Sequence, residues 1–353
     1  MELNNYTPFA SISWENVDAN NNWYATLISR VKLDITASSA DRNLGLKLSK
    51  DQGELFSKDT YYGEVGESSV QYESDYITYK PNTDVILNAN AISPKNKKRS
   101  AWDCGIRIFD NKQKLLKEYG LKVKGEKELH RAGLVWVPGF RKRSTQVPIR
   151  YERSAGGTIK KVFENKEDKH IKCNYYNPVG CGMKKVRDPK SVVYVPQIKY
   201  LYKKIGKVPA GFGFINRAWK SRLKYAGTYD QKWIETQHPL PPHDFDPYYN
   251  QAAHPELIMK GYLKAGTKIE LINLLEGREK YSFTLPSFDL VSRLRLHTGD
   301  IYQKMNLDTL IIDINSDNKE EHCIYASYRV QIPIKEDIEL AEIMLVQEEV
   351  KNG

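Results

Sequence analysis

The chain has 353 residues, of which 40% are hydrophobic and 28% are charged, and its formal net charge is +10. This composition is typical of a soluble globular protein with a substantial core. No apolar run approaches the roughly 20 residues that span a bilayer, and the N-terminal "MELNNYTPFASISW" lacks the basic and apolar regions of an export signal. We therefore expect a cytoplasmic protein without a membrane partner. No two of the four cysteines have the two-residue spacing of zinc or redox motifs, so we expect free thiols.

The first half of the chain carries β-strand patterns. We predict a strand over Tyr76–Ser93 that is interrupted near Pro81. Because proline lacks a backbone N–H, this strand is expected at an edge or a bulge. Further along, Cys104–Asp110 and Lys114–Val123 are separated by a short polar turn and predict a hairpin.

The middle of the chain is irregular. Glycine and proline recur every few residues in "RYERSAGGTIKK", "NYYNPVGCGMKK" and "KVPAGFGFINRAW", which predicts long ordered loops. Such loops often carry function on a rigid scaffold. The last of them leads into "INRAWKSRLKYAG", where Ile215, Trp219 and Leu223 recur at four-residue spacing. This spacing predicts a short helix that ends at Gly227.

The C-terminal part predicts two more hairpins. One joins Thr267–Leu275 to Lys280–Pro286, and the other joins Asp308–Asn315 to His322–Ile334. After them, Glu336–Glu342 fits a short helix, although the following "IMLVQEEV" fits a strand as well.

The predicted fold class is therefore mainly β, with antiparallel sandwich-like or barrel-like lobes, long ordered loops and few short helices. We place an N-terminal β lobe at residues 1–145 and a C-terminal β lobe with the long loops at residues 146–353. One continuous domain is the alternative.

Residues 224–256, "KYAGTYDQKWIETQHPLPPHDFDPYYNQAAHPE", are too rich in aromatic, proline, histidine and aspartate residues for an ordinary connection. One interpretation is a metal-dependent hydrolase, because five side chains of metal-ligand type occur here: His238, His243, Asp244, Asp246 and His254. The prolines among them favour an extended path that points neighbouring side chains in different directions. Asp244 and Asp246 also fit the role of turn and cap residues.

Other catalytic signatures are missing from the sequence. There is no GxSxG nucleophile motif, and "PAGFGF" lacks the third glycine of a dinucleotide fingerprint. We expect neither a cofactor nor a resident metal. The aromatic residues of the same segment suggest instead a clamp on the β core or, if they are exposed, a protein interface.

A basic strip raises a third possibility, which is nucleic-acid binding. Between residues 184 and 224 a single acid, Asp188, stands among twelve cations: Lys184, Lys185, Arg187, Lys190, Lys199, Lys203, Lys204, Lys207, Arg217, Lys220, Arg222 and Lys224. The strip could meet phosphates or an acidic protein. No nucleic-acid motif accompanies it, so direct nucleic-acid binding is the alternative and not the expectation.

Ordered sequence blocks carry a family resemblance. Residues 208–256 contain, in order, a PAGFG turn, a Trp and an Arg, AGTYD, a second Trp, a P-x-x-P pattern and DFD. Further blocks are "NNYTPFA", "YKPNTDVILNANAISP", "PIRYERSAGGT", "NPVGCG", "GYLKAGTKIELINL" and "LDTLIIDI…YASYRV". In these blocks, which cover nearly the whole chain, the sequence resembles the bacterial domain of unknown function with family number 2169, found beside type VI secretion genes. It departs from the family pattern at Ala155 and at Tyr328–Arg329.

The resemblance implies a non-catalytic adaptor or chaperone. Such a protein binds a type VI toxic effector, or its PAAR-like tip protein, and helps to load it onto the VgrG spike. The resemblance thus implies protein partners and no enzymatic activity. The metal-dependent hydrolase and the nucleic-acid binder remain the alternatives.

We predict that nine residues form one continuous partner-binding platform. In this platform the aromatic residues supply buried area, the arginines orient it by ion pairing, and the aspartates fix loop backbones or accept those arginines. The nine residues are Arg217, Trp219, Arg222, Tyr229, Asp230, Trp233, Asp244, Phe245 and Asp246.

Overall fold

The computed structural model describes residues 2–37, 43–133, 135–160, 171–183, 192–202, 206–316 and 318–346. In these residues β-strands dominate, and α-helix is limited to α1 (Lys220–Leu223) and α2 (Gln231–Thr236). The prediction of a mainly β protein with few short helices is confirmed. None of the helices in this part of the chain has the length and apolar character needed to span a bilayer.

The largest sheet has seven strands, in the order β12-β7-β23-β24-β3-β2, with β4 beside β3. Its strands are β2 (Ala10–Val17), β3 (Trp23–Ala37), β4 (Leu44–Leu48), β7 (Asp84–Ile92), β12 (Gln146–Pro148), β23 (Asn306–Ile314) and β24 (Cys323–Ile334). β7 and β23 run parallel, whereas the other neighbours run antiparallel. The antiparallel pair β23 and β24 confirms the last predicted hairpin.

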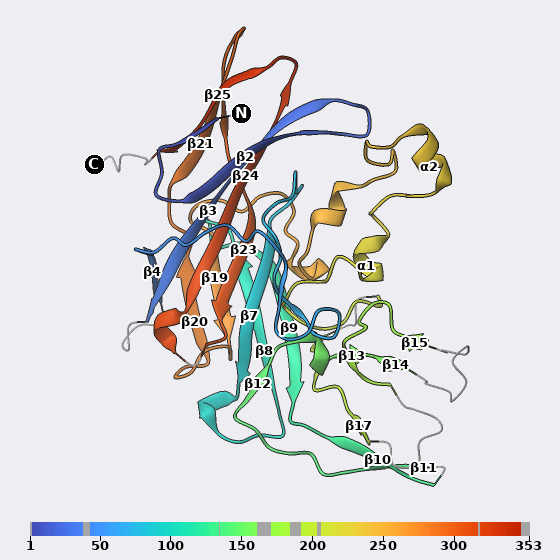
Figure 1. The fold of residues 1–353 in the computed structure, drawn as a ribbon. Coiled ribbons are helices and arrows are strands. Elements are labelled where there is room, and N and C mark those ends of the chain that lie inside the picture. Colours follow the sequence, from blue (N-terminus) through green and yellow to red (C-terminus); the bar gives the residue numbers. More distant parts are fainter. Residues whose placement is uncertain are drawn as a thin grey trace.

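The second large sheet has five antiparallel strands, in the order β18-β9-β8-β19-β20. They are β8 (Ala101–Phe109), β9 (Leu115–Lys124), β18 (Ile198–Tyr200), β19 (Lys268–Ile272) and β20 (Lys280–Thr284). The pairs β8–β9 and β19–β20 confirm the other two hairpins. Leu87 and Ile311 of the first sheet and Ile106 and Ile269 of the second belong to one buried cluster, so the sheets form a sandwich (Figure 1).

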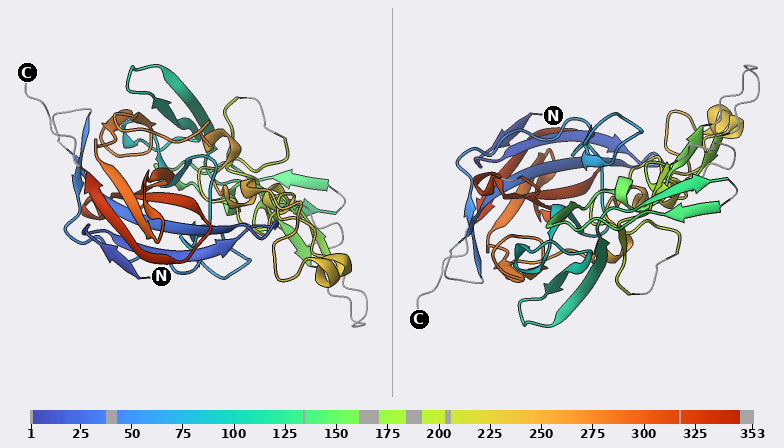
Figure 2. Two further views of the ribbon diagram at one scale, coloured as in Figure 1. Left: turned by 90° about the horizontal axis from the view of Figure 1, so that it is seen from above. Right: turned by 90° about the horizontal axis from the view of Figure 1, so that it is seen from below.

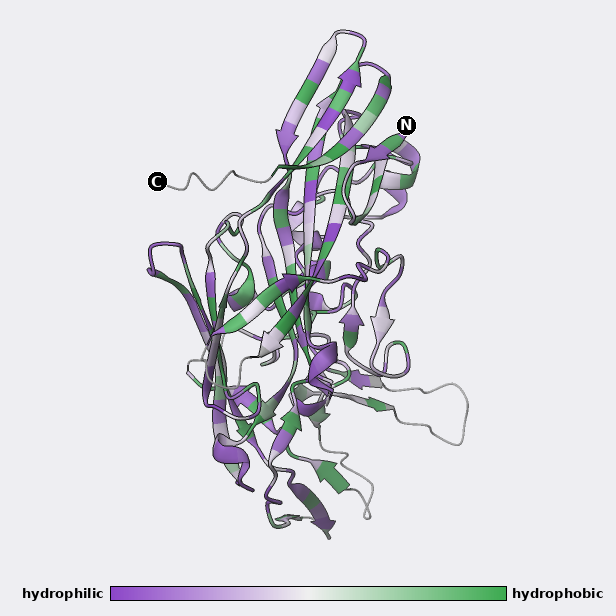
Figure 3. Ribbon diagram, turned by 90° about the vertical axis from the view of Figure 1, so that its left-hand side faces the viewer, coloured by the Kyte–Doolittle hydropathy of each residue, from purple (hydrophilic) through white to green (hydrophobic). Residues whose placement is uncertain are grey.

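A four-stranded sheet extends the sandwich at one end. It contains β1 (Leu3–Asn5), β25 (Ile338–Val346), β21 (Asp289–Leu296) and β22 (Gly299–Lys304), with β1 parallel to β25. Hydrophobic and hydrophilic residues alternate along these strands (Figure 3), as expected when successive side chains point to opposite faces. β25 settles the open choice for the C-terminal segment in favour of a strand.

The remaining elements are short, and those between residues 150 and 219 lie in the stretch that was predicted to be irregular. Their positions are β5 (Thr60–Tyr61), β6 (Val70–Tyr72), η1 (Pro94–Asn96), β10 (Glu128–Ala132), β11 (Val135–Pro138), η2 (Tyr151–Arg153), β13 (Ala155–Gly156), β14 (Thr158–Lys160), β15 (Ile171–Cys173), β16 (Cys181–Gly182), β17 (Val192–Tyr194), η3 (Pro247–Asn250), η4 (Pro255–Leu257) and η5 (Lys319–Glu321). Figure 2 shows that most of the green and yellow segments lie on one side of the blue and red strands of the sandwich.

Two local predictions are wrong in part. The strand predicted over Tyr76–Ser93 is β7, which begins only at Asp84. Pro81 therefore lies outside β7 and does not disturb its hydrogen bonds. β7 is therefore free to occupy an interior position between β12 and β23, where most of its residues are buried. The predicted helix is reduced to α1, because Ile215 and Trp219 belong to the preceding loop, where both are buried, and Leu223 is exposed.

Strands from both sides of residue 145 share the seven-stranded sheet, since β12 pairs with β7. The buried cluster likewise draws on residues from Phe9 to Ile343. The division into lobes at residues 1–145 and 146–353 stays a prediction.

Candidate functional site

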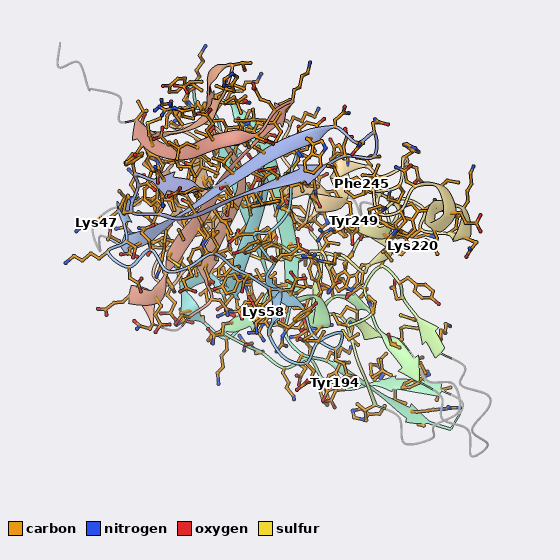
Figure 4. All side chains as sticks on the ribbon, turned by 45° about the horizontal axis from the view of Figure 1, so that its top comes forward. Lys47, Lys58, Tyr194, Lys220, Phe245 and Tyr249 are labelled. Atoms are coloured by element: carbon orange, nitrogen blue, oxygen red, sulfur yellow. The ribbon has the colours of Figure 1, made fainter. Side chains whose placement is uncertain are left out.

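The segment that follows α1 forms a projection beside the sandwich, and α2 lies at its outer end (Figure 1). The predicted site residues lie here on two levels. Arg222 and Trp219 are buried at the base, whereas Tyr229 is 57% exposed near the outer end. Phe245 and Tyr249 lie close to each other (Figure 4), with ring centroids 6.1 Å apart, and both are half-buried.

Arg222 is the centre of the base. Its Nη1 donates to Glu73 Oε1 at 2.6 Å and to the backbone oxygen of Ile215 at 2.8 Å. Its Nε donates to the backbone oxygen of Tyr249 at 2.9 Å. Arg222 thus joins its own segment to Tyr249 and Glu73, which are 27 and 149 positions away in the sequence. Burial alone would raise the pKa of Glu73, but the charges of Arg222 and Arg217 outweigh it and hold the pKa below its usual value.

Arg217 strengthens the same ionic contact from a more exposed position. Its Nη2 lies 2.8 Å from Asp59 Oδ1, and its Nε lies 3.4 Å from Glu73 Oε1. Two carboxylates from the N-terminal half of the chain therefore hold the projection in place. Both arginines do pair with acids, as predicted, but the acids are Glu73 and Asp59 and not the aspartates of the projection.

Trp219 packs into a small apolar cluster with Tyr151 and Ile215. Its ring meets that of Tyr151 edge-on, with centroids 5.2 Å apart. The hydroxyl of Tyr151 donates to the oxygen of Gly213 at 2.9 Å, so the ring is also fixed at its polar end. Trp219 therefore belongs to the support of the projection and not to an exposed surface.

The three aspartates fix loop backbones. Asp244 accepts hydrogen bonds from the backbone N and the hydroxyl of Thr228, at 2.9 and 2.7 Å, and these bonds lower the pKa of Asp244. Asp230 caps α2 by accepting from the backbone N of Trp233 at 2.9 Å. Asp246 caps η3 by accepting from the backbone N of Tyr248 at 2.8 Å. This is the first of the two roles predicted for them.

The outer end presents aromatic and aliphatic side chains. The rings of Tyr229 and Trp233 meet at 4.7 Å in an edge-on contact, and Ile234 beside them is exposed. The indole Nε1 of Trp233 donates to the oxygen of Leu240 at 3.0 Å, which closes the loop that returns from α2. The side chain of Gln237 donates to the backbone oxygen of Ala19 at 2.7 Å and so ties this loop to the turn between β2 and β3.

The five candidate metal ligands have separate environments. His254 is fully buried and stacks on Tyr119, with centroids 4.5 Å apart, whereas His243 is exposed. His238 meets the ring of Trp233 edge-on, and Asp244 and Asp246 hold backbone groups. Within the described ranges, no group of three or more His, Cys, Asp or Glu side chains is placed to hold a metal ion.

Hydrogen bonds define the tautomer of His254. Its Nδ1 accepts from the backbone N of Glu256 at 3.2 Å, so the ring proton lies on Nε2, which is 2.8 Å from Tyr200 Oη. The hydroxyl of Tyr200 in turn donates to the oxygen of Val208. Burial, with a smaller contribution from Lys117, lowers the pKa of His254 to about 3.

The basic strip is described only in part. Lys184, Lys185, Arg187, Lys190, Lys203 and Lys204 lie outside the described residues. Of the others, Arg217 and Arg222 make internal ion pairs, whereas Lys199, Lys207, Lys220 and Lys224 are exposed. The described part is therefore not one continuous cationic surface of free side chains.

Sequence reasoning missed Glu73 and Asp59, which anchor the projection. Glu73 is separated from Arg222 by 149 positions, and Asp59 from Arg217 by 158. No local pattern connects residues that are so far apart. Of the nine predicted residues, the structure brings Arg217 and Arg222 together through Glu73, and Tyr229, Asp230 and Trp233 together at α2.

The projection lies within the part of the chain that defines its family. Residues 21–324 match the family DUF2169, which is described as an uncharacterized protein conserved in bacteria. Because the match covers most of the chain, the protein belongs to this family. No curated protein and no solved structure matches the chain.

Proposed function

We propose that the protein is a non-catalytic adaptor that binds a type VI toxic effector, or its PAAR-like tip protein, and helps to load it onto the VgrG spike. The observation that carries this proposal is the contact of the exposed Tyr229 with the half-buried Trp233 at the outer end of a projection whose base is a buried ion pair. Membership of the bacterial family, together with its type VI resemblance, supplies the biological setting.

The physical argument rests on how protein interfaces gain affinity. Tyr and Trp are enriched among the residues that dominate binding energy, because each offers a large rigid surface with one polar group. A binding surface also loses less entropy when its support is already ordered. Here Arg222, Glu73 and Trp219 supply that ordered support, and Asp230 and Asp244 fix the loop that carries Tyr229 and Trp233.

An adaptor must also release its cargo. The exposed apolar side chains of the outer end are few, and polar residues such as Gln231, Lys232 and Glu235 surround them. A small aromatic centre with a polar rim is typical of interfaces that form and separate as folded proteins. We therefore expect a tight but reversible complex, centred on Tyr229, Trp233 and Ile234.

The test is affinity purification of the tagged protein from its own bacterium, followed by mass spectrometry. The wild type is compared with a Tyr229→Ala/Trp233→Ala double variant and with Tyr302→Ala, which removes an exposed aromatic ring from β22. We expect a toxin or a PAAR-like protein with the wild type and with Tyr302→Ala, and a loss of at least tenfold with the double variant.

Circular dichroism and urea unfolding first establish that both variants are folded. Recovery of neither partner, from cells that express the secretion genes, would contradict the adaptor function. Equal recovery with the wild type and the double variant would keep the adaptor function but move its binding surface away from α2.

A further inference from the structure

A second exposed surface lies on a small sheet that extends from the opposite end of the same side of the molecule. β11, β10 and β17 form this three-stranded sheet, which we term the arm (Figure 1). Figure 4 places Tyr194 of the arm far from Phe245 and Tyr249 of the projection. The arm is therefore separate from the aromatic pair on α2.

The strand register places four apolar side chains on one face of the arm, two on each outer strand. His130 of β10 lies between Val137 of β11 and Val192 of β17, since it pairs with both. Val135 lies two residues from Val137 on β11, and Tyr194 lies two residues from Val192 on β17. Because alternate residues of a strand point the same way, Val135 and Tyr194 share this face. These four apolar side chains are between 47% and 61% exposed.

The two faces of the arm differ in burial. Val193, which points to the other face, is buried, and Leu129 beside it is half-buried. Phe140, which follows β11, is fully exposed as well. Glu128 and His130 of the central strand share this face and lie between the apolar residues of the two outer strands. Single exposed apolar residues are ordinary, but several on one sheet face are typical of an interaction site.

Cations gather where the arm joins the five-stranded sheet. Lys122 of β9 lies directly opposite Lys199 of β18, and Lys124 lies two residues further along β9. Arg141, whose Nη1 donates to the oxygen of Gly125 at 2.7 Å, completes the group. Desolvation lowers the pKa of Lys124, and the nearby charges of Lys199, Arg141 and Lys122 lower it further.

Only part of this charge is compensated locally. Lys122 pairs with Asp103 at 3.0 Å, and on the arm itself Glu128 lies 3.3 Å from His130. Like charges placed directly opposite on neighbouring strands are unfavourable, so an incoming negative charge would relieve a repulsion that the fold leaves in place. The apolar face and the cations at its base together specify the chemistry of an occupant.

We propose that this face of the arm is a second protein-docking surface, and that its partner is an extended polypeptide segment with apolar side chains at alternate positions, followed by a run of acidic residues. The apolar side chains cover Val137, Val192 and Tyr194, and the acids reach Lys124 and Lys199. A second copy of this chain fits less well, because a symmetric contact would bring two identical cationic groups together. The inference is independent of the adaptor function and of the pair on α2.

The first experiment uses a defined probe, a fluorescein-labelled peptide in which Val or Tyr alternates with Ser and is followed by a run of Glu residues, measured by fluorescence anisotropy. Two control peptides replace either every Glu by Lys or every apolar residue by Ser. We expect saturable binding of the first peptide to the full chain, and affinity at least tenfold weaker for either control. Binding should also weaken as salt rises, because exposed ionic contacts are screened.

Matched variants locate the binding. Val137→Ser/Val192→Ser should lower the affinity for the Glu peptide roughly tenfold, which is a loss of about 1.4 kcal/mol of binding free energy. Val65→Ser, which removes an exposed valine far from the arm in sequence, should leave it unchanged. Lys124→Glu/Lys199→Glu, which keeps the apolar face, should reverse the preference from the Glu peptide to the Lys peptide.

Several results would overturn the proposal. These are no binding of the Glu peptide to the wild type, equal binding of the Glu and Lys peptides, and unchanged affinity in both double variants. Sedimentation velocity tests whether a second copy of this chain binds to the face instead. A wild-type dimer that Val137→Ser/Val192→Ser converts to a monomer would show that the face binds a second copy instead.

Discussion

Trp219, at the base of the projection, and Trp233, at its outer end, each lie close to a tyrosine, yet they have opposite surroundings. Trp219 is 4% exposed and packs on Tyr151, whereas Trp233 is half-buried beside the exposed Tyr229. The difference follows from what each segment meets. Residues 215–222 lie against Glu73 and Tyr151, while residues 229–234 extend past the edge of the sandwich. Aromatic and arginine content alone therefore does not separate the support of a binding surface from the surface itself.

The largest expected effect on stability comes from replacing one of the two arginines at the base. Arg222→Ala removes the main partner of a fully buried carboxylate, so the free energy of unfolding should fall by about 3–5 kcal/mol. Arg217→Ala is the matched control, because Arg217 contacts the same Glu73 from a partly exposed position. We expect it to cost about 1 kcal/mol or less. Urea unfolding measures both, and equal losses would show that Arg222 is not the centre of the base.

The next largest effect concerns the turn that leads from the base to the outer end. Gly227 has φ +82°, and an added Cβ would lie 3.0 Å from Pro242 Cβ and 3.1 Å from Phe245 N. Gly261 has nearly the same φ, +83°, and nothing within 4 Å of an added Cβ. Both Gly→Ala changes should cost about 1–2 kcal/mol from the left-handed backbone, and Gly227→Ala about 1 kcal/mol more from crowding.

Thermal and urea unfolding compare these two glycine variants. If Gly227→Ala costs no more than Gly261→Ala, the turn relaxes around the new methyl group. The projection would then be less firmly fixed than its hydrogen bonds indicate. A larger loss for Gly227→Ala would support a rigid connection between base and outer end.

His254 predicts a dependence of stability on pH. In the unfolded chain a histidine takes up a proton near pH 6.5, whereas folded His254 stays neutral down to about pH 3. The contribution of neutral His254 to the free energy of unfolding is therefore complete above pH 6.5, and it is lost as pH falls from 6.5 toward 3. At pH 5.5 the loss should be about 1.4 kcal/mol.

Urea unfolding at pH 7.5, 6.5 and 5.5 tests this prediction. His254→Gln should have a shallower fall in stability with decreasing pH than the wild type. His243→Gln, which replaces an exposed histidine of the same segment, should keep the wild-type slope. Identical slopes for all three proteins would show that His254 takes up its proton in the folded chain.

The sequence was sufficient to predict the elements that depend on local patterns. Alternating apolar residues and short polar turns marked the three hairpins, because both strands and their connection lie within one short stretch. The interior position of β7 was not predictable in this way. Its neighbours β12 and β23 come from distant parts of the chain, and β23 pairs with it in parallel.

The site follows the same division. The capping roles of Asp230 and Asp246 were predictable, since each aspartate holds a backbone N–H two or three residues ahead. The anchoring of Arg222 by Glu73 was not, because only the folded sheets bring them together. The short spacing of Ile215, Trp219 and Leu223 was misleading, since a loop can bury two of three residues as well as a helix can.

Trp233→Ala should have the smallest effect on global stability and the most local one. Because its ring is half-buried, the free energy of unfolding should change by about 0.5–1 kcal/mol, against about 3–5 kcal/mol for Trp219→Ala. The loss of the hydrogen bond to Leu240 and of the contact with Tyr229 should instead speed amide hydrogen exchange in residues 228–241. Exchange measured by mass spectrometry should leave the β7 and β23 peptides unchanged. If Trp233→Ala lowers global stability as much as Trp219→Ala, the outer end is part of the support, and the aromatic pair loses its claim to be a separate binding surface.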